Sequence, residues 1–160
     1  MKLYMKQKVF SWGDKFFIKD EFENDRYYVE GEVFSLGKKL HVYDSANREV
    51  AFIRQKVFSL MPRYYIEIDG RTIEIVKEFT FLKPSFNFVG LPWRLEGDFF
   101  AHEYTLYDAD GVVMNLSKHW FTWGDSYELE IFDERDALMC LCIALSVDAV
   151  LAQQSSNSAN

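Results

Sequence analysis

Cysteine, histidine, proline and glycine are all scarce in this chain. Its 160 residues include two cysteines, three histidines, three prolines and eight glycines. Cys140 and Cys142 lie two positions apart in one apolar segment, so their side chains diverge and form neither a disulfide nor a two-ligand metal clip. The small number of prolines and glycines argues against a disordered chain. Two thiols without a disulfide fit a reducing compartment, and we expect the protein in the cytoplasm.

The usual sequence marks of catalysis are also missing. His41, His102 and His119 form no His-x-His or His-x-x-x-His pair, which is the spacing of many metal ligands. The chain has no Gly-x-Ser-x-Gly elbow, no phosphate-binding glycine loop and no dinucleotide fingerprint. We therefore predict no catalytic residue, no metal and no cofactor. An enzyme with a pocket that sequence patterns do not reveal stays open as an alternative.

Basic residues are outnumbered by acidic ones, 18 to 25, which gives a formal net charge of −7. Binding nucleic acid without sequence preference depends on Lys and Arg side chains that neutralise phosphates. The acidic balance therefore predicts no nucleic-acid partner. Many carboxylates alternate with apolar residues, as in residues 127–131, and this alternation is typical of the outward face of a strand.

One segment, residues 134–153, has the composition of a helix that is apolar on every side. A helix on a protein surface shows one apolar stripe and one polar face, so this helix is either buried all round or inside a membrane. Its unbroken apolar run, residues 137–145, is nine residues long, and Ser146 and Asp148 then interrupt it. A membrane span needs about 20 predominantly apolar residues. We expect a buried helix that does not span a membrane.

The residues before this helix are predicted to form β-strands. Aromatic residues make up 18% of the chain and favour strands. A pattern of Phe, then Ser or Thr, a turn, and an aromatic residue recurs in copies at residues 6–18, 54–66 and 117–129, with a looser copy at 77–88. The repeats divide the chain into two similar halves, 1–68 and 69–132. Turns are marked by the pairs 13–14, 69–70, 110–111 and 124–125, all Gly-Asp or Asp-Gly, and give roughly ten to twelve strands.

These observations predict a mainly β fold in which an antiparallel barrel encloses the apolar C-terminal helix. An eight-stranded barrel is filled by its own side chains, so a barrel that holds a helix needs about eleven strands or more. A helix of about 20 residues rises about 30 Å, enough to cross such a barrel. We predict a single domain over residues 1–153 with a pseudo-two-fold internal repeat. The polar residues 154–160 are expected to form a disordered tail.

Asp148 is the only ionisable residue within the apolar core of the predicted helix. A buried carboxylate must be hydrogen-bonded, paired with a cation or protonated. We interpret Asp148 as a structural residue that anchors the helix to the barrel. A proton-linked or ligand-contacting role is the alternative.

Two pairs of basic residues occupy equivalent places in the repeat, Lys6 with Lys8 and Arg54 with Lys56. Within each pair the side chains lie on the same face of a predicted strand. The simple interpretation is a solvated strand face. The sharper hypothesis is a patch that contacts phospholipid headgroups.

The Phe-Ser and Phe-Thr hairpins, the Glu-Gly pairs at 30–31 and 96–97, and the apolar helix with Asp-Ala-Val-Leu at 148–151 together resemble the LURP-one-related family, in its YxjI-type bacterial branch. The resemblance covers about residues 3–153. It implies the tubby C-terminal-like fold, a closed barrel of about twelve antiparallel strands around a central C-terminal helix, which is related to phospholipid scramblases. Tubby domains bind phosphoinositides through basic surface residues, but no stretch of this chain matches that site.

We therefore expect a monomeric, non-enzymatic binding domain. The first hypothesis is weak binding to anionic phospholipid headgroups, with the protein peripheral at a membrane. The second is a protein-interaction scaffold with an unidentified protein partner, which should expose an apolar patch. The third is the enzyme, which requires a concave pocket with converging polar groups.

Overall fold

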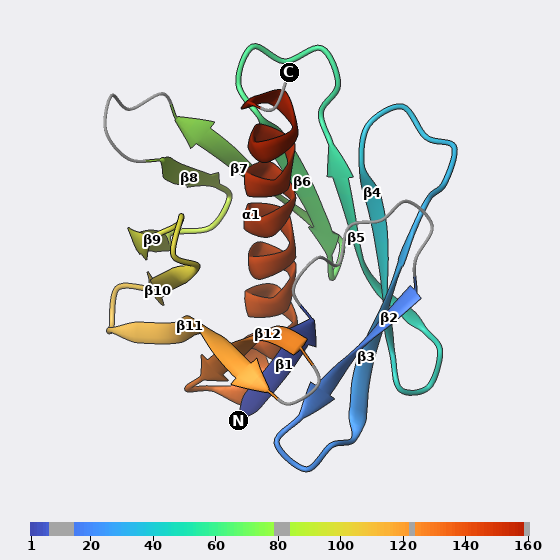
Figure 1. Ribbon diagram of the computed structural model, residues 1–160, viewed down its shortest axis with the longest axis vertical. Helices are drawn as coiled ribbons and strands as arrows, with labels where there is room; N and C mark the ends of the chain where they lie inside the picture. The colour runs from blue at the N-terminus through green and yellow to red at the C-terminus, as the bar shows by residue number, and fades with distance from the viewer. Residues whose placement is uncertain (7–14, 79–83, 122–123, 159–160) are drawn as a thin grey trace.

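Twelve β-strands and one long helix make up the described part of the chain (Figure 1). The computed structural model describes residues 1–6, 15–78, 84–121 and 124–158. The strands are β1 (Lys2–Lys6), β2 (Lys15–Asp20), β3 (Asp25–Gly31), β4 (Lys39–Asp44), β5 (Glu49–Gln55), β6 (Arg63–Ile68), β7 (Arg71–Glu78), β8 (Ser85–Val89), β9 (Arg94–Asp98), β10 (Glu103–Tyr107), β11 (Val112–Phe121) and β12 (Gly124–Ile131). A short 3-10 helix, η1 (Glu134–Asp136), leads into α1 (Ala137–Ser158).

All twelve strands belong to one antiparallel sheet that curls around α1 (Figure 1). Neighbours in the sheet are mostly neighbours in the chain, and the pairing of β1 with β12 brings the two ends of the β region together, with Leu3 opposite Leu129. The sheet begins at β8 and ends at β9. The two edges meet where the ring of Phe86 in β8 packs against that of Phe99, the residue after β9, with centroids 4.9 Å apart. The result is a nearly closed barrel around a central helix, which confirms the predicted fold.

The alternation of apolar and polar residues decides which side chains face the helix. In β6, for example, Tyr64, Ile66 and Ile68 are buried, and the residues between them are partly exposed. The helix has no polar face, and its residues from Cys140 to Val150 are all buried. Both cysteines have free thiols and fill space in this core. Each large aliphatic side chain buried here contributes roughly 1.5–3 kcal/mol to folding, so α1 is a main source of stability.

Asp133 caps η1, the 3-10 turn that leads into α1. The Asp133 carboxylate accepts a hydrogen bond from the backbone N–H of Arg135, at 2.9 Å, and also pairs with the Arg135 guanidinium. These contacts lower the pKa of Asp133 to about 2. At the other end α1 continues to Ser158, whereas the sequence analysis ends the helix at residue 153. By length and composition the segment Glu134–Gln153 would suit a membrane span, with a mean hydropathy of 1.7, but 78% of that apolar window is buried inside the sheet.

Because consecutive strands are antiparallel neighbours, their connections alternate between the two ends of the barrel. We call one end the polar end; it holds the turns β2–β3, β4–β5, β6–β7 and β10–β11. The other is the loop end, where β3 joins β4, β5 joins β6 and α1 finishes (Figure 1). The expected turns at 69–70 and 110–111 lie at the polar end, and the pair 13–14 lies outside the described residues.

Candidate functional site

Two neighbouring loops at the loop end present large apolar side chains to solvent. Residues 32–38 connect β3 to β4, and residues 56–62 connect β5 to β6 (Figure 1). Phe34 is 100% exposed, Phe58 98% and Leu60 99%. The other exposed apolar side chains of these segments are Val33, Leu36 and Val57. We call residues 33–38 and 56–62 the two apolar loops.

The two apolar loops are held against each other. The backbone N–H of Gln55 donates to the carbonyl of Lys38 at 2.7 Å, and the Gln55 side-chain oxygen accepts from the Lys38 backbone N–H at 3.0 Å. Gly37 has a φ of +80°, and a Cβ at this position would come within 2.7 Å of Val57. Gly37 therefore allows both the positive φ of the turn and the close approach of the second loop. The Gln55 amide also donates to the side chain of Gln153, which ties the end of α1 to the loops.

The conformation of Phe58 adds to its exposure. Its φ of +58° places a bulky non-glycine residue in the left-handed region, which costs roughly 1–2 kcal/mol. An exposed phenyl ring gains no packing energy in return. The loop therefore holds an apolar side chain in water in an unfavourable backbone conformation, as expected where a ligand or partner supplies the missing contacts.

The charges near the apolar loops are mainly basic. Within the connections 32–38 and 56–62 the ionisable side chains are Lys38, Lys56 and Glu32, and Glu32 pairs with Lys39 and His41. At the polar end, by contrast, segments 21–24, 45–48, 69–70 and 108–111 together contain Glu21, Glu23, Asp69, Asp108 and Asp110 and a single base, Arg48, which pairs with Asp44. A molecule with a negative net charge thus has an end that combines apolar side chains with positive charge.

Beneath the loop end, Asp148 of α1 lies in a buried polar cluster. Its carboxylate accepts a hydrogen bond from the Tyr127 hydroxyl of β12 and lies 4.0 Å from Nδ1 of His102, in the β9–β10 turn. The rings of His102 and Tyr127 lie 4.9 Å apart, centroid to centroid. The charge of Lys38, at the end of the first apolar loop, also acts on this carboxylate. The cluster therefore connects the core helix to the loop end.

Burial dominates the ionisation of this cluster. It raises the pKa of Asp148 to about 6, against the opposing effects of the Lys38 charge and the Tyr127 hydrogen bond. It lowers the pKa of Lys38 to about 8, although the charge of Asp148 acts in the other direction. Burial and the charge of Lys118 lower the pKa of His102. At neutral pH the carboxylate is ionised and the Lys38 ammonium is protonated, each near its midpoint.

The four basic residues of the sequence hypothesis do not form one cluster in the described part of the chain. Arg54 is engaged on the outer face of the sheet, with its Nε 2.9 Å from Glu67 and its guanidinium over the Tyr65 ring. Lys56 is exposed in the second apolar loop. Lys6 ends β1, which is separated from β5 by β2, β3 and β4. Lys8 lies outside the described residues.

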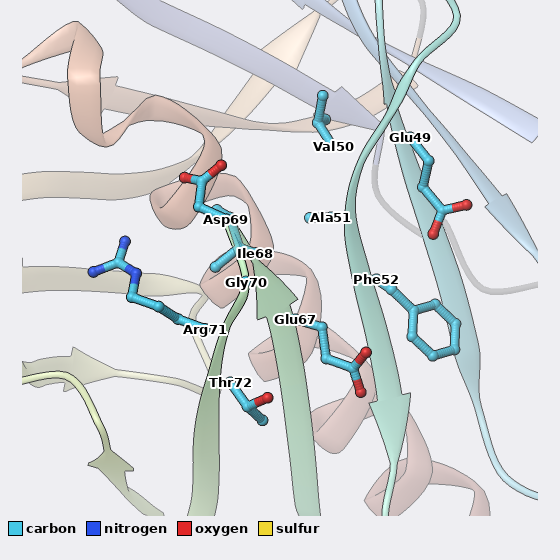
Figure 2. A pocket seen from close by; sticks show the side chains of 10 residues that line it. All are labelled: Glu49, Val50, Ala51, Phe52, Glu67, Ile68, Asp69, Gly70, Arg71 and Thr72. Carbon is cyan, nitrogen blue, oxygen red and sulfur yellow. The ribbon is translucent and has the colours of Figure 1, made fainter.

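A surface hollow of about 390 Å³ surrounds the β6–β7 turn at the polar end. Figure 2 shows the side chains of Glu49, Phe52 and Glu67 projecting to the same side of the strands that line it. Glu67 pairs with Arg54, and Glu49 lies 3.3 Å from His41. Across the described segments, no group of three or more His, Cys, Asp or Glu side chains is placed to hold a metal ion. The hollow thus presents paired surface charges, and the apolar loops are the stronger candidate site.

Comparison with known proteins places the chain in a family. The sequence model of the LURP-one-related family matches residues 1–148. The chain belongs to the LURP-one-related family. It is 45% identical over 159 residues to the uncharacterized protein YxjI of Bacillus subtilis (strain 168), covering 99% of this chain and 98% of that protein. The resemblance predicted from the hairpins and the helix is therefore confirmed.

The fold of this LURP-one-related chain is also found in a solved structure. An X-ray structure of a protein from Arabidopsis thaliana superposes with a TM-score of 0.59, covering 92% of this chain and 89% of that chain. The two sequences are 15% identical, so the likeness concerns the fold alone. The tubby-like architecture implied by the resemblance is thus present, and the site must be argued from this chain's own residues.

The apolar loops are not among the site residues predicted above, although the sequence carries a signal for them. Val-Phe-Ser-Leu occurs twice, at 33–36 and at 57–60, which is an offset of 57−33 = 24 residues. The second copy was interpreted as part of a strand repeat. Apolar residues in a strand-rich sequence are normally assigned to the core, and only the structure shows that these side chains point into solvent.

Proposed function

We propose that this LURP-one-related protein is a non-enzymatic binding domain that docks on the surface of anionic membranes through its loop end. The observation that carries the proposal is the pair of adjacent loops, each with an apolar tip and one lysine. Soluble proteins rarely expose contiguous apolar surface without a partner for it. The protein would act at the membrane surface and would not span the bilayer, because the apolar helix α1 is already buried in the barrel.

The chemistry of the two loops fits a bilayer interface. Phe34, Leu36, Phe58 and Leu60 protrude on two loops and can enter the boundary between headgroups and acyl chains. Burying one such side chain is worth roughly 1.5–3 kcal/mol. A lysine near an anionic surface adds about 1 kcal/mol. Stable membrane association usually takes two signals of this kind, and the loop end combines them.

The charge distribution supports one orientation. Lysines outnumber carboxylates in the two loop connections, and carboxylates outnumber bases in the turns of the polar end. An anionic membrane attracts the first and repels the second, so the negative net charge does not oppose docking with the loop end towards the lipid. This site replaces the sequence hypothesis of four clustered bases, of which it keeps Lys56.

Cosedimentation with vesicles tests the proposal. We expect wild type to sediment with phosphatidylcholine vesicles that contain phosphatidylserine, and less with phosphatidylcholine alone. The double variant Phe34→Ser with Phe58→Ser should lose this binding. The matched control is Phe22→Ser, which removes a phenyl ring that is 77% exposed in the β2–β3 turn at the polar end, and it should bind like wild type.

A protein partner would bury the same side chains, and the vesicle experiment separates the two hypotheses. Wild type that stays in the supernatant with both kinds of vesicle would contradict membrane docking and favour the protein-interaction scaffold. Equal loss of binding in the Phe22→Ser control would show that the loop end has no special role.

A further inference from the structure

The strands β8 and β9 follow each other in the chain but do not pair. Across the described segments, every other pair of consecutive strands is hydrogen-bonded, whereas β8 and β9 form the two edges of the sheet (Figure 1). The length of the connection does not explain this. Residues 90–93 join β8 to β9, and a connection of the same length, residues 21–24, joins β2 to β3, which do pair, with Lys15 opposite Glu30. We call the boundary between β8 and β9 the seam.

The register of the sheet shows which backbone groups of β8 face the seam. The N–H of Lys77 in β7 donates to the carbonyl of Pro62, on the side of β6, at 3.0 Å. Because successive residues of a strand direct their backbone groups to opposite sides, Val76 faces β8, where its partner is Asn87. Asn87 therefore bonds to β7, and the residues on either side of it direct their N–H and C=O groups towards the seam.

These two residues are Phe86 and Phe88. Their backbone groups have no partner across the seam within the part of the chain that the structure describes. Phe86 is only 4% exposed, so water does not fully replace the missing partner, and a buried backbone group without one costs free energy. A row of such groups on an edge strand is a template for pairing with another strand.

The edge at β8 also lacks the features that protect edge strands from pairing. Natural edges carry lysine, other charges or proline, and the sequence of β8, Ser-Phe-Asn-Phe-Val, contains none of these. The charges of β9 are already engaged, since Arg94 pairs with Glu96 and Asp98 accepts backbone N–H bonds of the following turn. Val89, at the end of β8, is 57% exposed. The seam therefore suits an uncharged strand that carries apolar side chains.

We propose that the seam binds an extended, uncharged peptide segment of a partner protein, which adds to the edge of β8 as a further strand. Backbone hydrogen bonds to Phe86 and Phe88 supply the affinity, and alternate side chains of the segment supply the specificity, as in other cases of strand addition. This inference goes beyond membrane docking and does not depend on it, because it uses neither apolar loop.

A library of linear seven-residue peptides displayed on phage, selected against the full-length protein, supplies the probe. Selected peptides should be uncharged, with β-branched or aromatic residues at alternate positions. One of them is then synthesised with and without N-methyl groups on alternate amides. N-methylation removes backbone donors and keeps every side chain, so the loss of two hydrogen bonds should weaken binding by about tenfold or more.

Residue-resolved amide hydrogen exchange locates the peptide. In the free protein the N–H of Asn87, bonded to β7, should exchange more slowly than that of Phe88. Saturating peptide should slow the exchange of the Phe88 N–H by about tenfold or more, in line with its effect on affinity, and leave that of Asn87 nearly unchanged.

Two proline variants give a matched pair. Phe88→Pro removes a donor that faces the seam, so it should abolish peptide binding while the β7–β8 ladder remains. Asn87→Pro removes a donor that bonds to β7, so it should lower the melting temperature further than Phe88→Pro does.

Several results would overturn the inference. They are a selection that enriches no peptide, binding that survives N-methylation, protection that falls on the apolar loops instead of β8, and a Phe88 N–H that already exchanges as slowly as that of Asn87 in the free protein. None of these measurements uses lipid, so the vesicle experiment decides membrane docking separately.

Discussion

The two ends of the barrel close several of their turns with different chemistry. At the polar end, Asp20, Asp44 and Asp108 each accept backbone N–H bonds from residues that follow them in the turn, at 2.8–2.9 Å. These hydrogen bonds lower the pKa of Asp20 and Asp44. At the loop end, the side chains of Phe34 and Phe58 are almost fully exposed to solvent. Asp98 forms a similar turn at the loop end and Phe22 is exposed at the polar end. The ends therefore differ chiefly in the two apolar loops, which expose several large apolar side chains together.

This difference indicates what each end is for. An aspartate that accepts backbone N–H bonds from two to four residues ahead fixes a tight turn. An exposed phenyl ring contributes nothing to the folded state by packing, and Phe58 also occupies a costly backbone conformation. The polar end therefore stabilises the fold, whereas the loop end retains surface for something outside the molecule.

Deleting α1 should unfold the whole barrel, because both of its ends pack around this helix. A chain truncated after Arg135 loses all of α1. Each buried aliphatic side chain lost costs roughly 1.5–3 kcal/mol, and a domain has only about 5–15 kcal/mol of net stability. We expect an insoluble or molten product without a cooperative thermal transition. A soluble fragment 1–135 that melts cooperatively would show that the helix is not the core.

The largest effect of a single substitution is expected at Asp148, beneath the loop end. Its pKa is 3.8 in the unfolded reference and about 6 in the fold. A raised pKa means that the stability contributed by the protonated group is fully present below about 3.8 and is lost as the pH rises through about 6. Relative to Asp148→Asn, wild type should therefore lose roughly 3 kcal/mol of unfolding free energy between acid and neutral pH.

Urea denaturation of wild type and Asp148→Asn across this pH range measures the effect. Lys38 and His102 titrate in both proteins, so the difference between the two curves reports Asp148 together with the effect of its charge on Lys38. Asp148→Ala is the control for the Tyr127 hydroxyl, which loses its acceptor in that variant. A constant difference between wild type and Asp148→Asn at all pH values would contradict the burial of an ionised carboxylate.

Two substitutions with smaller effects on stability should distinguish the roles of the two ends. Asp44→Ala removes the acceptor of the Ala46 and Arg48 backbone N–H groups at the polar end, so it should lower the urea midpoint and leave vesicle binding unchanged. Phe58→Ser should do the reverse, with a stability change below about 0.5 kcal/mol, typical of exposed sites. If Phe58→Ser destabilises the protein more than Asp44→Ala, the loop end is a structural element and the comparison fails.

Much of the fold follows from the sequence because apolar periodicity records burial. The alternation in β6 and the absence of a polar face in α1 each have one simple packing solution, a sheet wrapped around a helix. The extension of α1 to Ser158 was not predicted, because the last residues are polar and carry no periodic signal.

The candidate site was harder to predict, for two physical reasons. Exposed apolar residues at 33–36 and 57–60 look like strand residues, since sequence patterns record hydrophobicity and not the direction of a side chain. The buried cluster is different: Asp148 could be singled out, but its neighbours Lys38, His102 and Tyr127 come from segments that only the barrel brings together.

The central claim is that the loop end, and not the polar end, enters the bilayer, and a probe of membrane depth tests it most directly. Phe58→Cys and Phe22→Cys each add one exposed thiol, and both native thiols are fully buried, so an environment-sensitive fluorophore reports one site in each protein. With phosphatidylcholine–phosphatidylserine vesicles, the probe at position 58 should shift to shorter wavelength and be quenched by lipids brominated on their acyl chains. The probe at position 22 should not change. Unchanged emission at position 58 while the protein sediments with the vesicles, or equal quenching at position 22, would contradict the account.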